Sequence, residues 1–444
     1  MSSNYAELGE LYPAHIEAIK ARHDRALEKA GAGYAVIFSG APKLVFLDDA
    51  YYPFKANPHF VGWLPLTTTP FCYLIHTPGE VPVLVYYQEK DYWHTPPADP
   101  QGYWTDHFDI RVVHTVDDVA RHLPQTRDKC ILVGDIGDAA HAFKIERINP
   151  ASAINILHYA RSEKTGYELA CMRAASRRAV KGHRAAEEGF RAGKSEYEIH
   201  LAYCQAAKHT ENELPYGNII ALNEHSAIMH YQHQARESPA RTRSLLIDAG
   251  ANVHGYASDI TRSYSFEDSE FREFIDRLDA LQLDLVNEVK AGVDFKDLHL
   301  LTHRKIAELL VTAGLASGSI ESLIENDVTT AFFPTGLGHL LGIQVHDVGG
   351  FMEDESGNTI DRPSGHPWLR LTRTLEVDQV LTVEPGCYVI DMLLENLEGT
   401  PGAAMVNRDK VDWLRPFGGA RIEDNVRVLA DGCENFTRAA FAEP

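Results

Sequence analysis

The spacing of apolar positions first predicts a helix and then a series of short strands. Residues 5–30 carry apolar side chains near helical spacing, and Gly31 and Gly33 follow, so the helix is expected to end there. Next come short apolar runs bounded by Gly, Pro, Asp or Asn, which are typical of strands. We therefore expect a small α/β domain first. The predicted strands are residues 34–38, 44–47, 71–75, 83–87 and 130–133.

Helical spacing returns near residue 161. The sequence Thr-Gly-Tyr-Glu at residues 165–168 has the pattern of a capping box, in which the first side chain and the fourth satisfy each other's backbone N–H groups. It predicts a long helix that reaches Phe190. Residues 195–198 repeat the pattern and predict the start of another helix.

Beyond Pro215 the apolar runs are mostly short, and two further helices are predicted over residues 271–289 and 297–313. The chain has 444 residues, more than the roughly 250 that a single domain usually holds. We therefore predict two domains of the mixed α/β (α+β) class. They are expected to cover residues 1–160 and 161–444.

Composition and charge exclude several classes of partner and cellular location. The 42 Lys and Arg residues against 63 Asp and Glu give a net charge of −21, which repels phosphate backbones and anionic lipids, so neither nucleic acid nor membrane is expected as a partner. Residues 1–20 lack the pattern of a signal peptide, and no apolar run approaches the ~18 residues of a membrane helix. The six cysteines show no metal-knuckle spacing. We therefore expect a cytoplasmic protein with reduced thiols.

Four acidic residues stand at or inside apolar runs of the second region. Asp248 ends one run, and a turn at residues 251–255 leads into a returning run with Asp259, a hairpin pattern that places both aspartates on neighbouring strands. Glu384 closes another apolar run, and Glu423 also has apolar neighbours. A buried acid is costly unless it is paired or binds a metal. The pattern therefore favours a metal site.

The same region contains His339 at the end of a glycine-rich stretch, Thr-Gly-Leu-Gly-His. If the four carboxylates converge near it, they raise one another's pKa unless cations neutralise them, and two divalent ions would balance the charge. Oxygen ligands with one imidazole favour Mn(II), with Co(II) or Zn(II) as substitutes. A water molecule bridging two such ions becomes a hydroxide nucleophile near neutral pH. The residues therefore predict a hydrolase.

In their order along the chain these five residues resemble the pita-bread metallopeptidases, the group that contains methionine aminopeptidase, aminopeptidase P and prolidase. This match runs from residue 161 to the C-terminus. Segments 46–49, 52–55 and 91–94 are similar to bacterial prolidases of the PepQ type, close to the organophosphorus acid anhydrolases. The resemblance implies a C-terminal pita-bread domain, cleavage of Xaa-Pro dipeptides and a side activity on phosphotriesters.

Roles for individual residues also follow from the resemblance. Glu384 is expected to act as the general base for the attacking water in addition to binding metal. The implied ligands of two divalent ions are Asp248, Asp259, His339, Glu384 and Glu423.

On the substrate side, the resemblance implies that His230 and His346 stabilise the tetrahedral oxyanion or the departing amine. Arg370 would bind the free carboxylate of a dipeptide through two parallel hydrogen bonds. Tyr216 is expected to be a further substrate contact.

Residues outside this set are expected to support the site. Asp49 and Trp93 resemble loop residues that reach the pocket of a neighbouring subunit, which implies a homodimer. Arg421 is expected to orient Glu423.

One position departs from the family pattern, which is usually His-Gly-x-Gly-His. Thr335 stands where the first histidine is expected, so we expect metal binding to persist with lower turnover or an altered substrate preference. Two alternative functions stay open. One is an aminopeptidase P-type enzyme that takes longer peptides, and the other is a catalytically weak pita-bread protein that binds peptides.

Overall fold

The computed structural model describes residues 2–135 and 143–444, and the chain divides into two compact units, here called unit 1 and unit 2. Both contain helices and strands, so the mixed α/β prediction is confirmed, whereas the boundary between residues 160 and 161 stays a prediction. Unit 1 comprises Met1–Cys171, Val253–Tyr256 and Met352–Thr359. Unit 2 comprises Met172–Asn252, Ala257–Phe351 and Ile360–Pro444.

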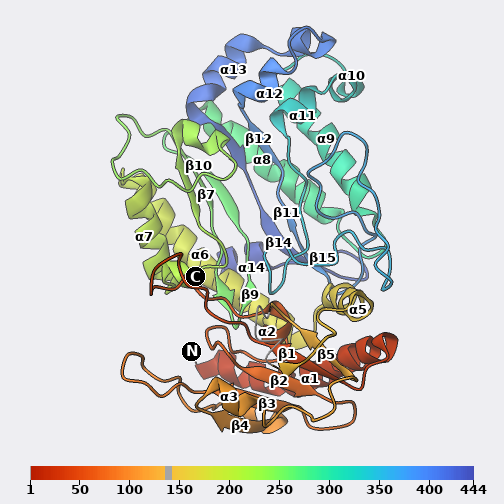
Figure 1. The fold of residues 1–444 in the computed structure, drawn as a ribbon. Helices are drawn as coiled ribbons and strands as arrows, with labels where there is room; N and C mark the ends of the chain where they lie inside the picture. Colours follow the sequence, from red (N-terminus) through yellow and green to blue (C-terminus); the bar gives the residue numbers. More distant parts are fainter. Residues whose placement is uncertain (1, 136–142) are drawn as a thin grey trace. The chain divides into compact units, whose positions relative to one another are not determined.

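Unit 1 is built on a five-stranded sheet with one long helix beside it (Figure 1). Its elements are α1 (Ser2–Ala30), β1 (Tyr34–Phe38), α2 (Pro58–Val61), β2 (Tyr73–His76), β3 (Val83–Tyr87), η1 (Thr105–His107), β4 (Asp109–Val113), α3 (Val116–Val119), β5 (Cys130–Val133) and α5 (Ala151–Arg161). The strand order is β4-β3-β2-β1-β5. Pairs β1/β5 and β3/β4 are parallel, and the other two are antiparallel.

Four of the five strands predicted for unit 1 are confirmed, and the one at residues 44–47 is wrong. Leu44 forms only an isolated bridge with Tyr51, while Phe46 and Leu47 are 85% and 90% exposed. This apolar run forms no strand because no neighbouring strand pairs along it and no core covers it. Sequence reasoning also missed β4, whose residues Asp-Ile-Arg-Val-Val lie at the sheet edge, where two are exposed, two are partly buried and one is buried.

From residue 166 onward long helices alternate with short strands. The elements are α6 (Gly166–Arg191), α7 (Glu196–Ala207), η2 (Glu211–Glu213), β6 (Ile219–Leu222), η3 (Asn223–Ala227), β7 (Ser244–Asp248), β8 (Asn252–Val253), β9 (Tyr256–Ala257), β10 (Thr261–Ser265), α8 (Glu270–Asn287), α9 (Phe295–Thr312), α10 (Ile320–Glu325), α11 (Val328–Phe332), β11 (Val380–Val383), β12 (Gly386–Tyr388), α12 (Asp391–Glu395), η4 (Pro401–Met405), α13 (Arg408–Leu414), η5 (Arg415–Phe417), β13 (Gly419–Arg421), β14 (Asp424–Val428), β15 (Cys433–Asn435) and α14 (Phe436–Ala442).

The four long helices of this region begin close to where the sequence predicted, and α6, α8 and α9 also end close to their predicted ends. The capping box of α6 is formed by Thr165 and Glu168, whose side chains and backbone N–H groups bond reciprocally. Ser195 and Glu198 form the second capping box at the start of α7. Within the described part of the chain, none of the helices combines the length and the apolar character that a membrane span requires.

Two antiparallel sheets of unit 2 meet where the acidic residues stand. Their strand orders are β10-β7-β6 and β11-β14-β15. Thr261 of β10 pairs with Asp248 of β7 and also forms a bridge with Glu423, which joins the first sheet to the second. Another bridge, between Leu340 and Leu381, lays the segment that carries His339 beside β11.

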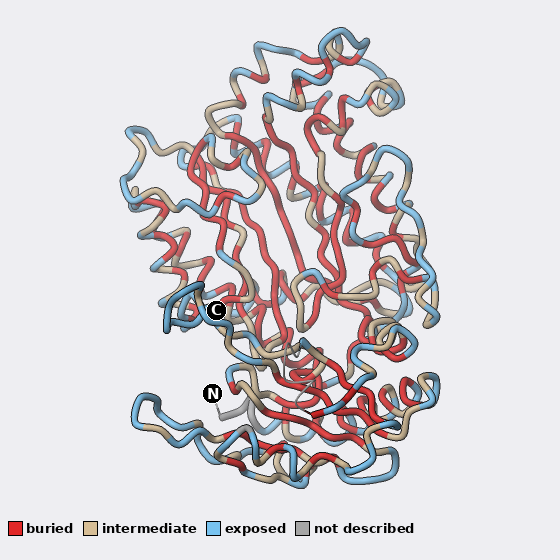
Figure 2. Tube along the Cα trace, viewed as in Figure 1, coloured by how far each residue is buried: buried red, intermediate tan, exposed pale blue. Residues whose placement is uncertain are grey.

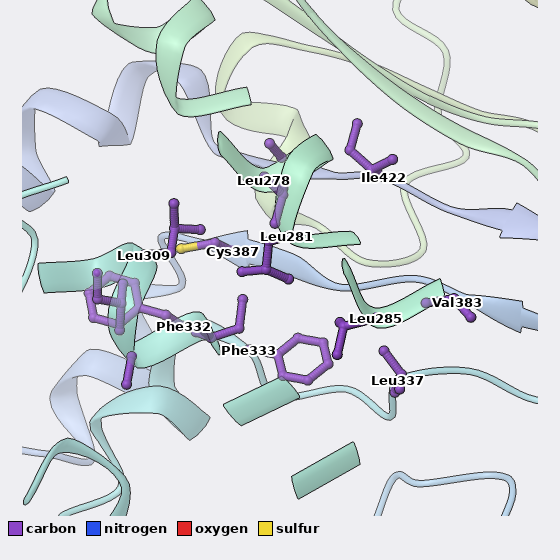
Figure 3. Packing of buried hydrophobic residues seen from close by; sticks show 14 of the residues in the cluster. Leu278, Leu281, Leu285, Leu309, Phe332, Phe333, Leu337, Val383, Cys387 and Ile422 are labelled. Atoms are coloured by element: carbon purple, nitrogen blue, oxygen red, sulfur yellow. The ribbon is translucent and has the colours of Figure 1, made fainter. Parts of the chain in front are cut away.

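Apolar clusters fix these sheets against the helices of unit 2. Side chains of α6 and α7 pack on β6 and β7, and those of α8, α9 and α11 pack on β11 (Figure 3). Figure 2 shows that the strands of both sheets are buried over most of their length, except for β15, which is partly buried. Burial of one Leu or Phe side chain stabilises the fold by roughly 1.5–3 kcal/mol, so the strand ends are held firmly. Residues that Figure 3 labels in the second cluster are Leu278, Leu281, Leu285, Leu309, Phe332, Phe333, Leu337, Val383, Cys387 and Ile422.

His23 of α1 is a buried histidine whose contacts require the neutral ring. Its Nε2 accepts a hydrogen bond from the indole Nε1 of Trp63 at 3.2 Å, so its Nδ1 carries the proton and donates to the Ile19 carbonyl at 2.9 Å. Burial lowers the pKa of His23 to about 3. In the unfolded chain a histidine takes up a proton below about pH 6.5.

We expect unit 1 to lose stability as the pH falls from about 7 to about 5, because the unfolded state binds this proton first. His23 should account for about 2 kcal/mol of the lost free energy of unfolding. His23→Gln keeps an acceptor for Trp63 but does not titrate, so it should remove this part of the pH dependence. Urea unfolding of both proteins at the two pH values measures the difference. An equal pH dependence in wild type and H23Q would contradict the expectation.

Candidate metal centre

The two aspartates are placed by the hairpin of β7 and β10. Asp248 is the last residue of β7, and Asp259 lies two residues before β10. The backbone N–H of Asp259 donates to Oδ1 of Asn425 at 2.9 Å, and the Asn425 amide donates back to the Asp259 carbonyl. This reciprocal pair holds the Asp259 backbone against the start of β14.

His339 is held by an unusually close approach to β11. Its backbone N–H donates to Oγ1 of Thr382 at 3.1 Å, and its carbonyl accepts from the Thr382 N–H at 3.0 Å. A Cβ at Gly338 would lie 2.0 Å from the Thr382 carbonyl oxygen, so only glycine permits this approach. Nδ1 of His339 bonds the Leu340 carbonyl at 3.0 Å, which leaves Nε2 for the carboxylates.

The imidazole and three of the carboxylates converge on one buried space. Nε2 of His339 lies 3.5 Å from Oδ2 of Asp259 and 3.6 Å from Oε1 of Glu384. Asp259, His339 and Glu423 each offer a potential ligand atom within 4.8 Å of the other two. All three of these residues are buried. The geometry therefore provides one nitrogen and several carboxylate oxygens for a cation.

Tyr216 links the fourth carboxylate, that of Asp248, to this group. Its hydroxyl lies 2.7 Å from Oδ1 of Asp248 and 2.5 Å from Oδ1 of Asp259. One hydroxyl has a single hydrogen and can donate to only one of the two at a time. The sequence placed Tyr216 among the substrate contacts, whereas its hydroxyl lies between two of the acids.

Arg421 is the guanidinium that pairs with this acidic group. Its Nη2 donates to Oδ2 of Asp248 at 2.7 Å, its Nε to Oγ1 of Thr261 at 3.1 Å and its Nη1 to the Tyr388 hydroxyl at 2.9 Å. Thr261 in turn donates to Oε2 of Glu423 at 2.6 Å. Arg421 thus reaches Glu423 through Thr261, while its direct ion pair is with Asp248.

The negative charge of the group exceeds what the nearby cationic side chains balance. Burial raises the pKa of Asp248 to about 6 and that of Glu384 to about 7, and it raises the pKa of Glu423 well above its usual range. Each of the three pKa values is raised further by the neighbouring carboxylates, although Arg421 lowers all of them.

Asp259 is the exception among the four acids. Burial acts to raise its pKa, but the hydrogen bond and charge of His339 outweigh it and hold the pKa below the usual value. Burial likewise acts to lower the pKa of His339, and Asp259 together with Glu384 raises it instead. Four carboxylates and one imidazole that are buried or partly buried, with part of their charge uncompensated, fit divalent cations.

The predicted substrate-side histidine His346 lies against the same site. Its ring centroid is 4.4 Å from that of His339 at nearly a right angle. Desolvation and the charge of His339 lower the pKa of His346 to about 4, and the charges of Arg370 and His230 act in the same direction. Both Arg370 and His230 are exposed to solvent. The structure therefore brings Arg370 and His230 within electrostatic range of His346.

The remaining predicted residues divide between the two units. Thr335 of unit 2 has a buried hydroxyl that finds no hydrogen-bond partner within the described residues. Asp49 and Trp93 belong to unit 1, where both are exposed, Trp93 to 75%. Their expected contact with a neighbouring subunit stays a prediction.

Sequence reasoning missed several residues that position the acids. Thr382 donates to Oε1 of Glu384 at 3.4 Å, and Thr261 holds Glu423 as described above. Thr382 lies two residues before Glu384, so strand alternation puts both on one face, and this periodicity could have found it. Nothing in the local pattern could have revealed Asn425 or Tyr388, because their partners are distant in sequence.

Two family models match the chain. Residues 10–159 match the N-terminal domain of Xaa-Pro dipeptidase, and residues 170–430 match metallopeptidase family M24. The chain belongs to metallopeptidase family M24. The resemblance recognised in the sequence is therefore confirmed, and membership of this family implies divalent metal ions.

Relatives extend the similarity over nearly the whole chain. The Xaa-Pro dipeptidase of Xanthomonas campestris pv. campestris strain B100 is 49% identical over 439 residues, covering 98% of this chain and 99% of that protein. The Xaa-Pro dipeptidase of Shewanella pealeana is 46% identical over 432 residues, covering 97% of this chain and 98% of that protein.

Solved structures support the same fold. A zinc-substituted Escherichia coli aminopeptidase P in complex with product has a TM-score of 0.72 and 23% identity, covering 96% of this chain and 95% of that one. Proline aminopeptidase P II from Yersinia pestis also has a TM-score of 0.72, with 24% identity and 96% coverage of both chains. These similarities, together with the M24 match, confirm the predicted N-terminal domain and C-terminal pita-bread domain.

The raised pKa values of Asp248 and Glu384 predict a pH-dependent affinity for metal. Binding a divalent ion must displace protons that these groups hold below about pH 7, so the apparent affinity for Mn(II) should fall as the pH is lowered. Each displaced proton costs about tenfold in affinity per pH unit. Isothermal titration calorimetry in two buffers of different ionisation enthalpy counts the protons released. An affinity that stays constant from about pH 8 to about pH 5.5 would contradict this.

Proposed function

We propose that this chain is an Xaa-Pro dipeptidase that acts with two divalent metal ions. The observation that carries the proposal is the convergence of four carboxylates and one imidazole whose charge Arg421 balances only in part. Relatives named Xaa-Pro dipeptidase, at 46% to 49% identity over nearly the whole chain, support the substrate class. The proposed ligands are Asp248, Asp259, His339, Glu384 and Glu423.

The donor set favours Mn(II) as the resident ion, with Co(II) or Zn(II) as substitutes, because it is rich in oxygen and has one nitrogen. When bound, such ions would lower the pKa of a bound water molecule and polarise the substrate carbonyl. Glu384 is proposed to accept the proton of the attacking water. The leaving nitrogen of proline is a secondary amine that needs a proton to depart, and Glu384 can deliver the one it has taken.

Residues around the acids are proposed to hold the substrate. His346, with a pKa of about 4, is neutral at neutral pH and can donate one N–H to a developing oxyanion, and His230 is proposed to share this role. Arg370 carries an exposed guanidinium that can bind the carboxylate of a dipeptide through two parallel hydrogen bonds. Tyr216 is proposed as a substrate contact beside the carboxylates that its hydroxyl touches.

We further propose that the chain forms a homodimer through loops of unit 1 that carry Asp49 and Trp93. In support, Phe46, Leu47 and Tyr92 are 85%, 90% and 86% exposed, and Trp93 is 75% exposed. Exposed large apolar side chains such as these can serve as contacts for a second chain. Burying them against a second copy would remove this apolar area from water.

The candidate metal centre is also proposed to hydrolyse phosphotriesters as a side activity, because an activated water attacks phosphorus much as it attacks a carbonyl carbon. The protein is proposed to work in the cytoplasm, and its six free cysteines suit a reducing compartment.

Removal of metal tests the proposal directly. Chelation should abolish cleavage of Ala-Pro, and adding Mn(II), Co(II) or Zn(II) singly should restore it to different extents. Ala-Pro should be cleaved at least about tenfold better in kcat/KM than a tripeptide with the same first two residues, since Arg370 needs the carboxylate next to proline. A phosphotriester is assayed under the same conditions as the two peptides.

The other functions predict different results in the same assay. Preference for the tripeptide would indicate an aminopeptidase P-type enzyme. Metal binding without cleavage of either peptide would indicate a peptide-binding protein, and full activity after chelation would overturn the metal-dependent mechanism.

Thr335 provides a second test, because its buried hydroxyl has no partner among the described residues. Thr335→His should raise kcat for Ala-Pro by about tenfold, since an imidazole adds a hydrogen-bond donor near the substrate. Thr335→Val, which removes the hydroxyl without adding a donor, is the matched control and should behave like the wild type. Steady-state kinetics with metal analysis measures both variants. An unchanged kcat in T335H with full metal content would argue against this role.

A further inference from the structure

A second group of histidines lies in unit 2 and shares no residue with the candidate metal centre. His299 and His303 stand one turn apart on α9, where they are 1% and 2% exposed, and His366 lies in the loop that leads to Arg370. Each of the three offers a ring nitrogen within 4.8 Å of the other two. Helix spacing brings the first two together, and the chain returns to add the third.

The rings face one another closely. Ring centroids are 4.9 Å apart for His299 and His303, 4.6 Å for His299 and His366, and 4.6 Å for His303 and His366. Nε2 of His299 lies 3.0 Å from Nδ1 of His366. In a tetrahedral site with metal–nitrogen distances of about 2.05 Å the ligand nitrogens lie roughly 3.3 Å apart. Small side-chain rotations would therefore bring these nitrogens to ligand spacing.

Two of the ring nitrogens are buried without a hydrogen bond. Within the described residues, Nδ1 of His299 and Nε2 of His303 have no partner, and since His299 faces His366 through its Nε2, an ion bound among the three rings would satisfy Nε2 of His303. A buried polar atom without a partner destabilises the fold, so a native structure usually supplies one. Nδ1 of His303 lies 3.0 Å from Oγ1 of Thr329, which fixes the ring and leaves Nε2 available.

The charge state of the cluster also suits a metal ligand set. Burial lowers the pKa of His299 to about 2 and that of His303 to about 3, and the neighbouring histidines lower both further. Burial lowers the pKa of His366 as well, against the nearby charge of Asp327. At neutral pH all three rings therefore keep a lone pair for a cation.

We propose that His299, His303 and His366 bind one zinc ion in a site separate from the candidate metal centre. Three neutral imidazoles suit Zn²⁺ better than Mn²⁺ or Mg²⁺, which prefer oxygen ligands. His366 is only half-buried, so a water molecule can complete a four-coordinate site from that side. The ion ties α9 to the loop that ends at Arg370 and restrains that loop.

The test is to count zinc bound to the full-length protein. After equilibrium dialysis against Zn²⁺, elemental analysis should find one more zinc per chain in the wild type than in His366→Gln. This variant changes a half-buried loop residue, so the fold should tolerate it, and His303→Gln should lose the same equivalent. Cobalt(II) gives a second readout, because a tetrahedral three-imidazole site adds a visible absorption band that H366Q should lack.

His94→Gln is the matched control. Glu89, Asp91 and His94 form an exposed group that also places three potential ligand atoms within 4.8 Å of one another, so it is the competing location. H94Q should keep the extra zinc. The double variant D259N/E423Q should keep it too, which separates this result from the fate of the proposed dipeptidase. Equal zinc content in wild type and H366Q, or its loss in H94Q alone, would overturn the proposal.

Discussion

Electrostatic repulsion among four carboxylates, two buried and two partly buried, is the constraint around which unit 2 is organised. Asp248, Asp259, Glu384 and Glu423 share a space in which burial and the neighbouring carboxylates raise the pKa of three of them, and Arg421 balances only part of the charge. Such a group persists in a folded protein when a cation completes it. The family membership, the donor types and the pKa shifts therefore all lead to the same requirement for divalent metal.

Holding like charges together requires a rigid frame, and the apolar core of unit 2 provides it. Each acid stands at or beside the end of a strand, and the strands themselves are packed against α6, α7, α8 and α9. Backbone contacts fix the positions of individual ligands within this frame. One example is the close approach of His339 to Thr382, which Gly338 permits. The hydrophobic clusters thus hold the strands in place against the electrostatic repulsion among the four carboxylates.

Much of this arrangement could be predicted from local patterns. Capping boxes located the starts of α6 and α7, and apolar spacing located α8 and α9, because these signals act within a few residues. The run at residues 44–47 misled because an apolar strand pattern forms a strand only where a partner covers it, and here Leu47 is 90% exposed. Tyr216, Arg421 and Asp248 were all recognised as site residues, but the contacts of Tyr216 and Arg421 with Asp248 were not predicted.

By itself the sequence determined which residues carry chemistry, since acids inside apolar runs and a histidine among glycines are visible one segment at a time. Tertiary structure decided which of these segments meet. His299 and His303 already shared a helix face by their spacing, yet only the folded chain brings His366 to them. The physical reason is that periodicity fixes the face on which a side chain lies, while packing between distant segments fixes what that face meets.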